Sequence, residues 1–86
     1  MDTGMHASFD LVLIENGKYL VQSHHGIWFG FVTDEPCNFA VGARLSGSFQ
    51  QPGTFCITSQ NGEQVQARVK LSHATQAEGV LWLYSS

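Results

Sequence analysis

Basic residues are scarce in this sequence. Four lysines and arginines stand against seven aspartates and glutamates, which gives a formal net charge of −3 at pH 7. Proteins that bind nucleic acids or anionic lipids draw much of their affinity from basic side chains that neutralise phosphates. Both partners are therefore disfavoured. Charged residues make up only 13% of the chain, about half of the usual share of roughly 25%, so two copies would repel each other weakly.

Long hydrophobic runs are also absent. The longest runs, residues 11–14 and 80–83, contain four apolar residues each, whereas a transmembrane helix needs roughly 18. The first ten residues carry an acidic residue where a signal peptide would have basic ones, and no apolar stretch follows. We therefore expect a cytoplasmic protein with no membrane partner. In that reducing compartment Cys37 and Cys56 should remain thiols.

Helical periodicity is missing over any useful length. The 86 residues, 43% of them hydrophobic, instead form short alternating or apolar segments separated by turn residues. We predict strands at residues 9–15, 18–23, 27–33, 39–49, 54–60, 63–72 and 80–85, with a connector at 73–79 that has room for one helical turn. Short strands at this spacing indicate an all-β fold: a small, partly open barrel or sandwich of six to seven antiparallel strands, with SH3-like or OB-like alternatives. We expect one domain over residues 1–86, with a flexible segment at residues 1–8.

The first hairpin carries the clearest local signal. Asn16-Gly17 lies between two apolar segments, and this dipeptide tolerates the positive φ that both central positions of a type I′ turn require. A two-residue turn also fixes the register of the strands. The predicted facing pairs are Glu15 with Lys18, Leu13 with Leu20, and Val12 with Val21. A second Asn-Gly pair, at residues 61–62, predicts another hairpin.

A glycine in the third predicted strand suggests a binding surface. Trp28, Gly30 and Val32 share one face of that strand, so the missing side chain leaves a notch beside an indole. A ligand or a partner side chain could fill this notch. Alternatively, an aromatic residue of the same chain, such as Phe49 or Trp82, fills it. We predict Trp28, Gly30, Val32 and Trp82 as the ligand-binding or partner-binding residues.

Residues 29–32, with the sequence Phe-Gly-Phe-Val, resemble the aromatic ribonucleoprotein motif of cold-shock domains. The resemblance covers four residues and implies an OB barrel whose aromatic side chains stack on single-stranded bases. In that family lysine precedes the motif, whereas here Ile27 and Trp28 precede it and Asp34 and Glu35 follow it. This departure removes the electrostatic part of nucleic-acid binding. Single-stranded nucleic-acid binding therefore ranks behind the other hypotheses.

Histidines and carboxylates offer an alternative from another class. A small metal-dependent or carboxylate-dependent enzyme could use His24, His25 and His73 together with the Asp34-Glu35 turn. However, the sequence has no C-x₂-C or H-x₃-H spacing, and no nucleophile stands in a pattern that pairs it with a base. We therefore predict no catalytic residues, no metal ligands, no cofactor and no enzymatic activity.

Three predicted strands, residues 9–15, 27–33 and 80–85, are apolar on both faces. A barrel strand has only one inner face, so the outer faces would form an exposed apolar patch unless something covered them. The loops are short, and a second copy in a two-fold contact is the commonest cover. We predict a homodimer. The favoured function is a non-catalytic binding protein that self-associates and binds a small apolar ligand or a protein partner.

Overall fold

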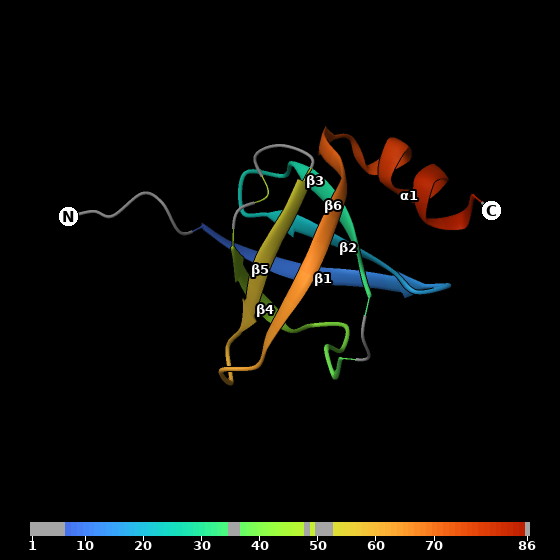
Figure 1. Cartoon of the computed structure of the whole chain (residues 1–86). Coiled ribbons are helices and arrows are strands. Elements are labelled where there is room, and N and C mark those ends of the chain that lie inside the picture. The colour runs from blue at the N-terminus through green and yellow to red at the C-terminus, as the bar shows by residue number, and fades with distance from the viewer. Residues whose placement is uncertain (1–6, 35–36, 48, 50–52, 86) are drawn as a thin grey trace.

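The computed structural model describes residues 7–34, 37–47, 49 and 53–85 (Figure 1). Its elements are β1 (Ala7–Glu15), β2 (Lys18–Ser23), β3 (Trp28–Thr33), β4 (Arg44–Gly47), β5 (Gly53–Ser59), β6 (Gln64–Ala74) and α1 (Gln76–Tyr84). The strands form an antiparallel barrel in the order β1-β2-β3-β6-β5-β4. The predicted small all-β barrel is confirmed. It is closed rather than partly open, because residues 7–10 of β1 pair with β4. Ala7 and Ser8, expected in a flexible segment, are therefore strand residues.

The turn between β1 and β2 has the predicted backbone conformation. Asn16 has a φ of +54° and Gly17 a φ of +77°, the positive values that a type I′ turn needs at both centres. The turn therefore sets the register next to it as expected. Two of the three predicted pairs are confirmed, namely Glu15 with Lys18 and Leu13 with Leu20.

The third predicted pair is wrong because β1 contains a bulge. Val21 faces Leu11 instead of Val12, and the register shifts between Leu11 and Leu13. A bulge places one extra residue on one strand and changes which way the following side chains point. As a result Leu11 belongs to the barrel interior, while Val12 and Leu13 both pack against the outer cluster under α1.

Side chains from all six strands fill the barrel interior. The alternation predicted for β6 is present, with residues 65, 67 and 69 buried and residues 64, 66, 68 and 70 exposed. Phenylalanine rings dominate the core, and Phe9 and Phe49 meet edge to face with centroids 4.4 Å apart. The buried set is Phe9, Leu11, Val21, Phe29, Phe31, Phe39, Leu45, Phe49, Ile57, Val65, Ala67 and Val69.

The strand predicted at residues 39–49 is much shorter in the structure. Among the residues of this segment that the structure describes, the strand covers Arg44–Gly47. Before it, the Ala43 N–H donates to the Ala40 carbonyl at 2.9 Å, which closes a turn containing Gly42, whose φ is +96°. The alternating sequence fits a strand, but this turn interrupts it. Residue 48 lies outside the described residues.

The strand predicted at residues 80–85 is wrong, because residues 76–84 form α1. Thr75 caps the helix: its side chain accepts from the Glu78 N–H at 3.2 Å, and its own N–H donates to the Glu78 carboxylate at 2.8 Å. This reciprocal pair is a capping box, and its Thr-x-x-Glu pattern was present in the sequence. The helix could not be recognised from hydrophobic periodicity, because apolar residues occur on all of its sides.

The helix α1 covers the outer face of the barrel over β1, β2, β3 and β6 (Figure 1). A second cluster of apolar side chains lies between them. It comprises the buried residues Leu20, Trp28, Ala74 and Leu83, with Val12, Leu13, Leu71 and Trp82 packed around them. The outer apolar faces that led us to predict a dimer are thus covered in large part by the chain's own helix.

Candidate functional site

The predicted notch at Gly30 is filled from within the chain. A β-carbon at Gly30 would lie 2.5 Å from Cζ3 of Trp82, so the indole rests directly on the glycine. The notch was expected to hold either a ligand or partner side chain, or an aromatic residue of the same chain. The structure shows the second, with Trp82 in the notch. Trp28 is only 7% exposed in the cluster beneath α1, and Val32 is half-buried further along β3. Trp28 and Gly30 therefore lie beneath α1, and Trp82 is the residue of α1 that covers Gly30, whereas Val32 is not among the described residues of this cluster.

Lys18 holds the C-terminal end of this helix. Its ammonium group donates to the carbonyl oxygens of Trp82 at 2.8 Å and Ser85 at 2.6 Å, and lies 5.3 Å from the centroid of the Trp82 ring. The last carbonyls of a helix lack intrahelical partners and carry partial negative charge. The last turn of α1 has no basic residue of its own. Lys18 supplies that charge from β2, a role that its predicted pairing with Glu15 alone does not include.

The outward side of α1 is apolar as well. Leu81 is 74% exposed and Tyr84 57% exposed, and Ala77 is also exposed. The spacing of these three residues places them on one face of a helix. We call this face the outer stripe of α1. The opposite side of the helix, which includes Gly79 and Leu83, is buried against the barrel.

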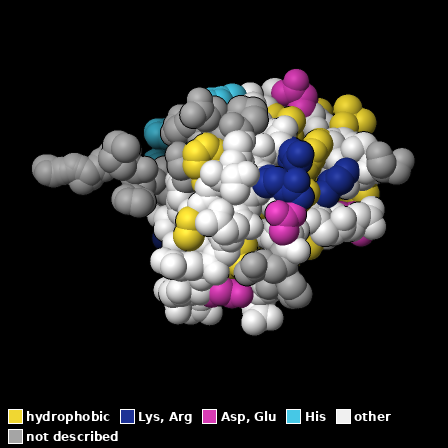
Figure 2. Space-filling view, viewed as in Figure 1, with side chains coloured by type: hydrophobic (Ala, Val, Ile, Leu, Met, Phe, Trp, Pro, Cys, Tyr) yellow, Lys and Arg dark blue, Asp and Glu magenta, His cyan; other side chains and the backbone are white. Residues whose placement is uncertain are grey.

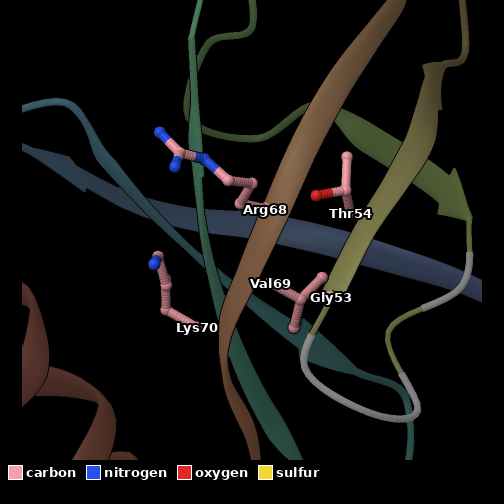
Figure 3. Close-up of a pocket in the computed structure, with 5 residues that line it drawn as sticks. All are labelled: Gly53, Thr54, Arg68, Val69 and Lys70. Carbon is pink, nitrogen blue, oxygen red and sulfur yellow. The ribbon is translucent and has the colours of Figure 1, made fainter.

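A shallow groove lies beside β6 on the outer face of the barrel (Figure 3). We call it the cationic groove: it has a volume of about 230 Å³ and is lined by Gly53, Thr54, Arg68, Val69 and Lys70. Arg68 and Lys70 are exposed, whereas Val69 between them points into the core. Figure 3 shows the two long side chains extending to the same side of β6. The alternation of β6 therefore gathers two cations at one surface.

Lys18 extends this positive region across the sheet. Lys18 faces Val32, and Val32 in turn faces Arg68. With Lys70, three of the four basic residues of the chain thus lie on one outer face, and Figure 2 shows lysine and arginine side chains gathered there. The Asp34 carboxylate is hydrogen-bonded and ion-paired with Arg68. This group cannot be recognised in the sequence, because residues 18 and 68 meet only through the register of β3.

The fourth basic residue is remote from the cationic groove. Arg44 lies on β4, whose residues 45 and 46 pair with residues 59 and 58 of β5, at the opposite end of that strand from Gly53 and Thr54. Its guanidinium group forms an ion pair with Asp10 at 3.5 Å, and both side chains are well exposed. Arg44 is therefore a natural control for Arg68, since each is an exposed arginine next to one aspartate.

Three histidines meet at another hollow. His24, His25 and His73 line a volume of about 170 Å³ together with Phe9, Ser23, Ile27 and Phe29. We call it the histidine hollow. The imidazoles proposed for the alternative enzyme are thus brought together. Asp34 is not among the lining residues and pairs with Arg68 instead, and Glu35 lies outside the described residues. Within the described ranges, no group of three or more His, Cys, Asp or Glu residues is arranged to hold a metal ion.

The two cysteines are free, as expected. Cys37 lies 3.2 Å from the hydroxyl group of Tyr19, whose ring stacks on Phe31 with a centroid separation of 5.0 Å. Burial raises the pKa of Tyr19 above its ordinary value, and the hydrogen bond with Cys37 raises it further. This environment favours the neutral phenol, because ionisation would put a charge into a partly apolar site.

Comparisons with protein families, with curated proteins and with solved structures find no match to this chain. In the described part of the chain, no helix has both the length and the apolar character needed to cross a membrane.

Proposed function

We propose that the protein is a non-catalytic binding module that forms a homodimer through the outer stripe of α1. The exposure of Leu81 and Tyr84 carries this proposal. A helix that is hydrophobic all round is normally buried, and α1 is buried on one side only. Covering the outer stripe would remove large apolar side chains from water, at a gain of about 1.5 to 3 kcal/mol for each one fully buried.

A second copy of the chain is the partner that fits this stripe best. In a two-fold contact the same surface meets itself, so two antiparallel α1 helices would bring their apolar stripes together. The charges at the helix ends are complementary in that arrangement. Glu78 lies in the first turn, and Lys18 lies at the last carbonyls, so the acidic end of one helix would face the basic end of the other. The small side chain of Ala77 would allow close approach.

The oligomeric state tests this proposal. Light scattering after size exclusion at roughly 50 μM, well above the Kd of a stable dimer, should give twice the 9.4 kDa of one chain. Leu81→Glu should give a monomer with unchanged circular dichroism. Val41→Glu is the matched control, because Val41 is 61% exposed and lies outside α1; it should remain dimeric. A 9.4 kDa wild-type protein at this concentration would overturn the proposal.

Binding of a small apolar ligand is a second candidate, and the histidine hollow favours it. Phenylalanine and isoleucine side chains form part of its lining, and imidazoles offer hydrogen bonds beside them, the mixture of apolar walls and few polar groups that is typical of ligand pockets. Titration with phenol, followed by the NMR signals of the histidine rings, should show saturable shifts that Ile27→Asp abolishes. Absence of saturation in the wild type would exclude this candidate.

A further inference from the structure

We propose that the cationic groove binds the phosphoryl group of a small soluble molecule. The chain carries a net charge of −3 with only four basic residues. Two of those four line the groove, and Lys18 lies on the same outer face, next to Val32. The groove is thus a positive site on an acidic protein, and it is separate from the outer stripe used for the dimer.

The groove offers hydrogen-bond donors of three kinds. Arg68 presents a guanidinium fork with five N–H donors, and the structure shows one of its nitrogens, Nη2, bonded to Asp34. Lys70 makes no ion pair with any residue that the structure describes. Thr54 lies beside Arg68 in the β5–β6 pair, and Figure 3 shows its hydroxyl group directed toward β6. A guanidinium fork, an ammonium group and a hydroxyl group thus belong to one groove, with Arg68 and Lys70 extending to one side of β6 and Thr54 lying on the other.

The number of donors favours a phosphoryl group over a carboxylate. Arginine binds either anion through two parallel hydrogen bonds, and lysine adds a point charge. A phosphoryl group has three terminal oxygens to share among such donors. The volume of about 230 Å³ is below the roughly 300 Å³ at which pockets for drug-sized ligands begin. The ligand should therefore be small, a phosphate ester or pyrophosphate rather than a large cofactor.

Asp34, next to the groove, should weaken its affinity for anions. Asp34 bonds to Arg68 and repels an incoming anion, so it competes with the phosphoryl group for the guanidinium. Asp34→Asn should therefore tighten binding. A long polyanion such as nucleic acid would meet the same repulsion together with the acidic charge of the whole chain. This supports a small ligand over a polymer.

Titration of the full chain with inorganic pyrophosphate tests the proposal. Amide NMR signals of residues 53–54 and 68–70 should shift saturably, and Lys70→Gln and Arg68→Gln should each weaken binding by roughly tenfold, the size expected for loss of one charge-assisted contact. Arg44→Gln removes the same charge from another face and should bind like the wild type. Absence of saturation, or an equal loss in Arg44→Gln, would overturn the proposal.

Two further experiments are needed. The first distinguishes a soluble phosphate ester from a lipid headgroup, and the second tests whether binding depends on the dimer. Glycerol 3-phosphate should compete with pyrophosphate for the groove. In contrast, the protein should not co-sediment with vesicles of phosphatidylcholine that contain phosphatidic acid. Binding to vesicles without binding to glycerol 3-phosphate would overturn the assignment to a soluble ligand. Leu81→Glu should bind pyrophosphate as the wild type does, so a failed dimer proposal would leave this one intact.

Discussion

Gly79 of α1 lies against Leu20 of β2, so that a β-carbon at residue 79 would stand 2.8 Å from Cδ1 of Leu20. Gly30 of β3 has the corresponding relationship with Trp82 of α1. Helix and barrel therefore meet at two glycine contacts, one contributed by each partner. The distances are shorter than normal carbon–carbon contacts of about 3.5 to 4.0 Å, so larger residues at either site would push the helix away.

Gly30→Ala should destabilise the protein by about 1 to 3 kcal/mol, the usual cost of overpacking a close contact. The added methyl group meets the rigid indole of Trp82, which has to move. Urea unfolding measures the loss. In a Trp82→Ala background the same change at residue 30 should cost much less, because the two residues are in contact and their effects are not additive. Equal losses in both backgrounds would refute the contact.

Lys18→Gln should destabilise α1 by about 1 kcal/mol, since it removes the charge at the helix C-terminus. Hydrogen exchange of the last helical amides should accelerate, and the tryptophan emission should shift as Trp82 loosens. Lys70→Gln removes the same charge from a residue that forms no hydrogen bond with α1 in the part of the chain that the structure describes, and should leave both signals unchanged. Equal effects of the two variants would mean that Lys18 does not cap the helix.

Gly17→Val should cost about 1 to 3 kcal/mol, because a β-branched residue resists the positive φ of this turn. No atom lies within 4 Å of a β-carbon built at Gly17, so the loss comes from the backbone alone. An unchanged urea midpoint would show that the turn adopts another conformation in solution.

Leu45→Ala should destabilise the barrel by about 2 to 4 kcal/mol, whereas Arg44→Ala should cost less than about 0.5 kcal/mol. Leu45 is fully buried in the barrel core, and its neighbour Arg44 is exposed. Urea titrations of the two variants compare the two faces of β4. Equal losses would mean that β4 presents its faces the other way round.

Stability should fall above about pH 10, the ordinary pKa of tyrosine, in part through Tyr19. Its folded pKa is raised, so the unfolded chain loses the phenolic proton first. The stabilising contribution is complete below the unfolded pKa and is lost as pH rises toward the folded value. Tyr19→Phe should flatten the pH dependence of the urea midpoint between pH 9 and 11. An identical slope in the variant would contradict the raised pKa.

The sequence predicted β6 well, because its two faces differ in polarity. Val65, Ala67 and Val69 alternate with polar residues and face inward, because only one face of β6 is buried. The helix could not be predicted by the same logic. Leu81 and Leu83 are both apolar although one is exposed and the other buried, and period alone cannot tell such a segment from a strand.

The candidate sites depend on contacts that are distant in the sequence. His25 and His73 reach one hollow because β2 ends and β6 ends at the same side of the barrel. Arg68 joins Lys18 only across β3. The sequence pointed to the three histidines that line one hollow, since their chemistry is apparent from residue type. It could not supply the cationic groove, because nothing local links residues 54 and 68.

The closure of the barrel by β1 and β4 governs how this protein can be recognised. Every strand that the structure describes has a neighbour on both sides, so no strand of the barrel leaves a complete edge free for another chain to extend the sheet. Recognition through backbone pairing alone, which is tolerant of sequence, is therefore disfavoured. Partners of this protein should instead recognise particular side chains, so a few surface substitutions would be enough to change the partner while the barrel stays intact.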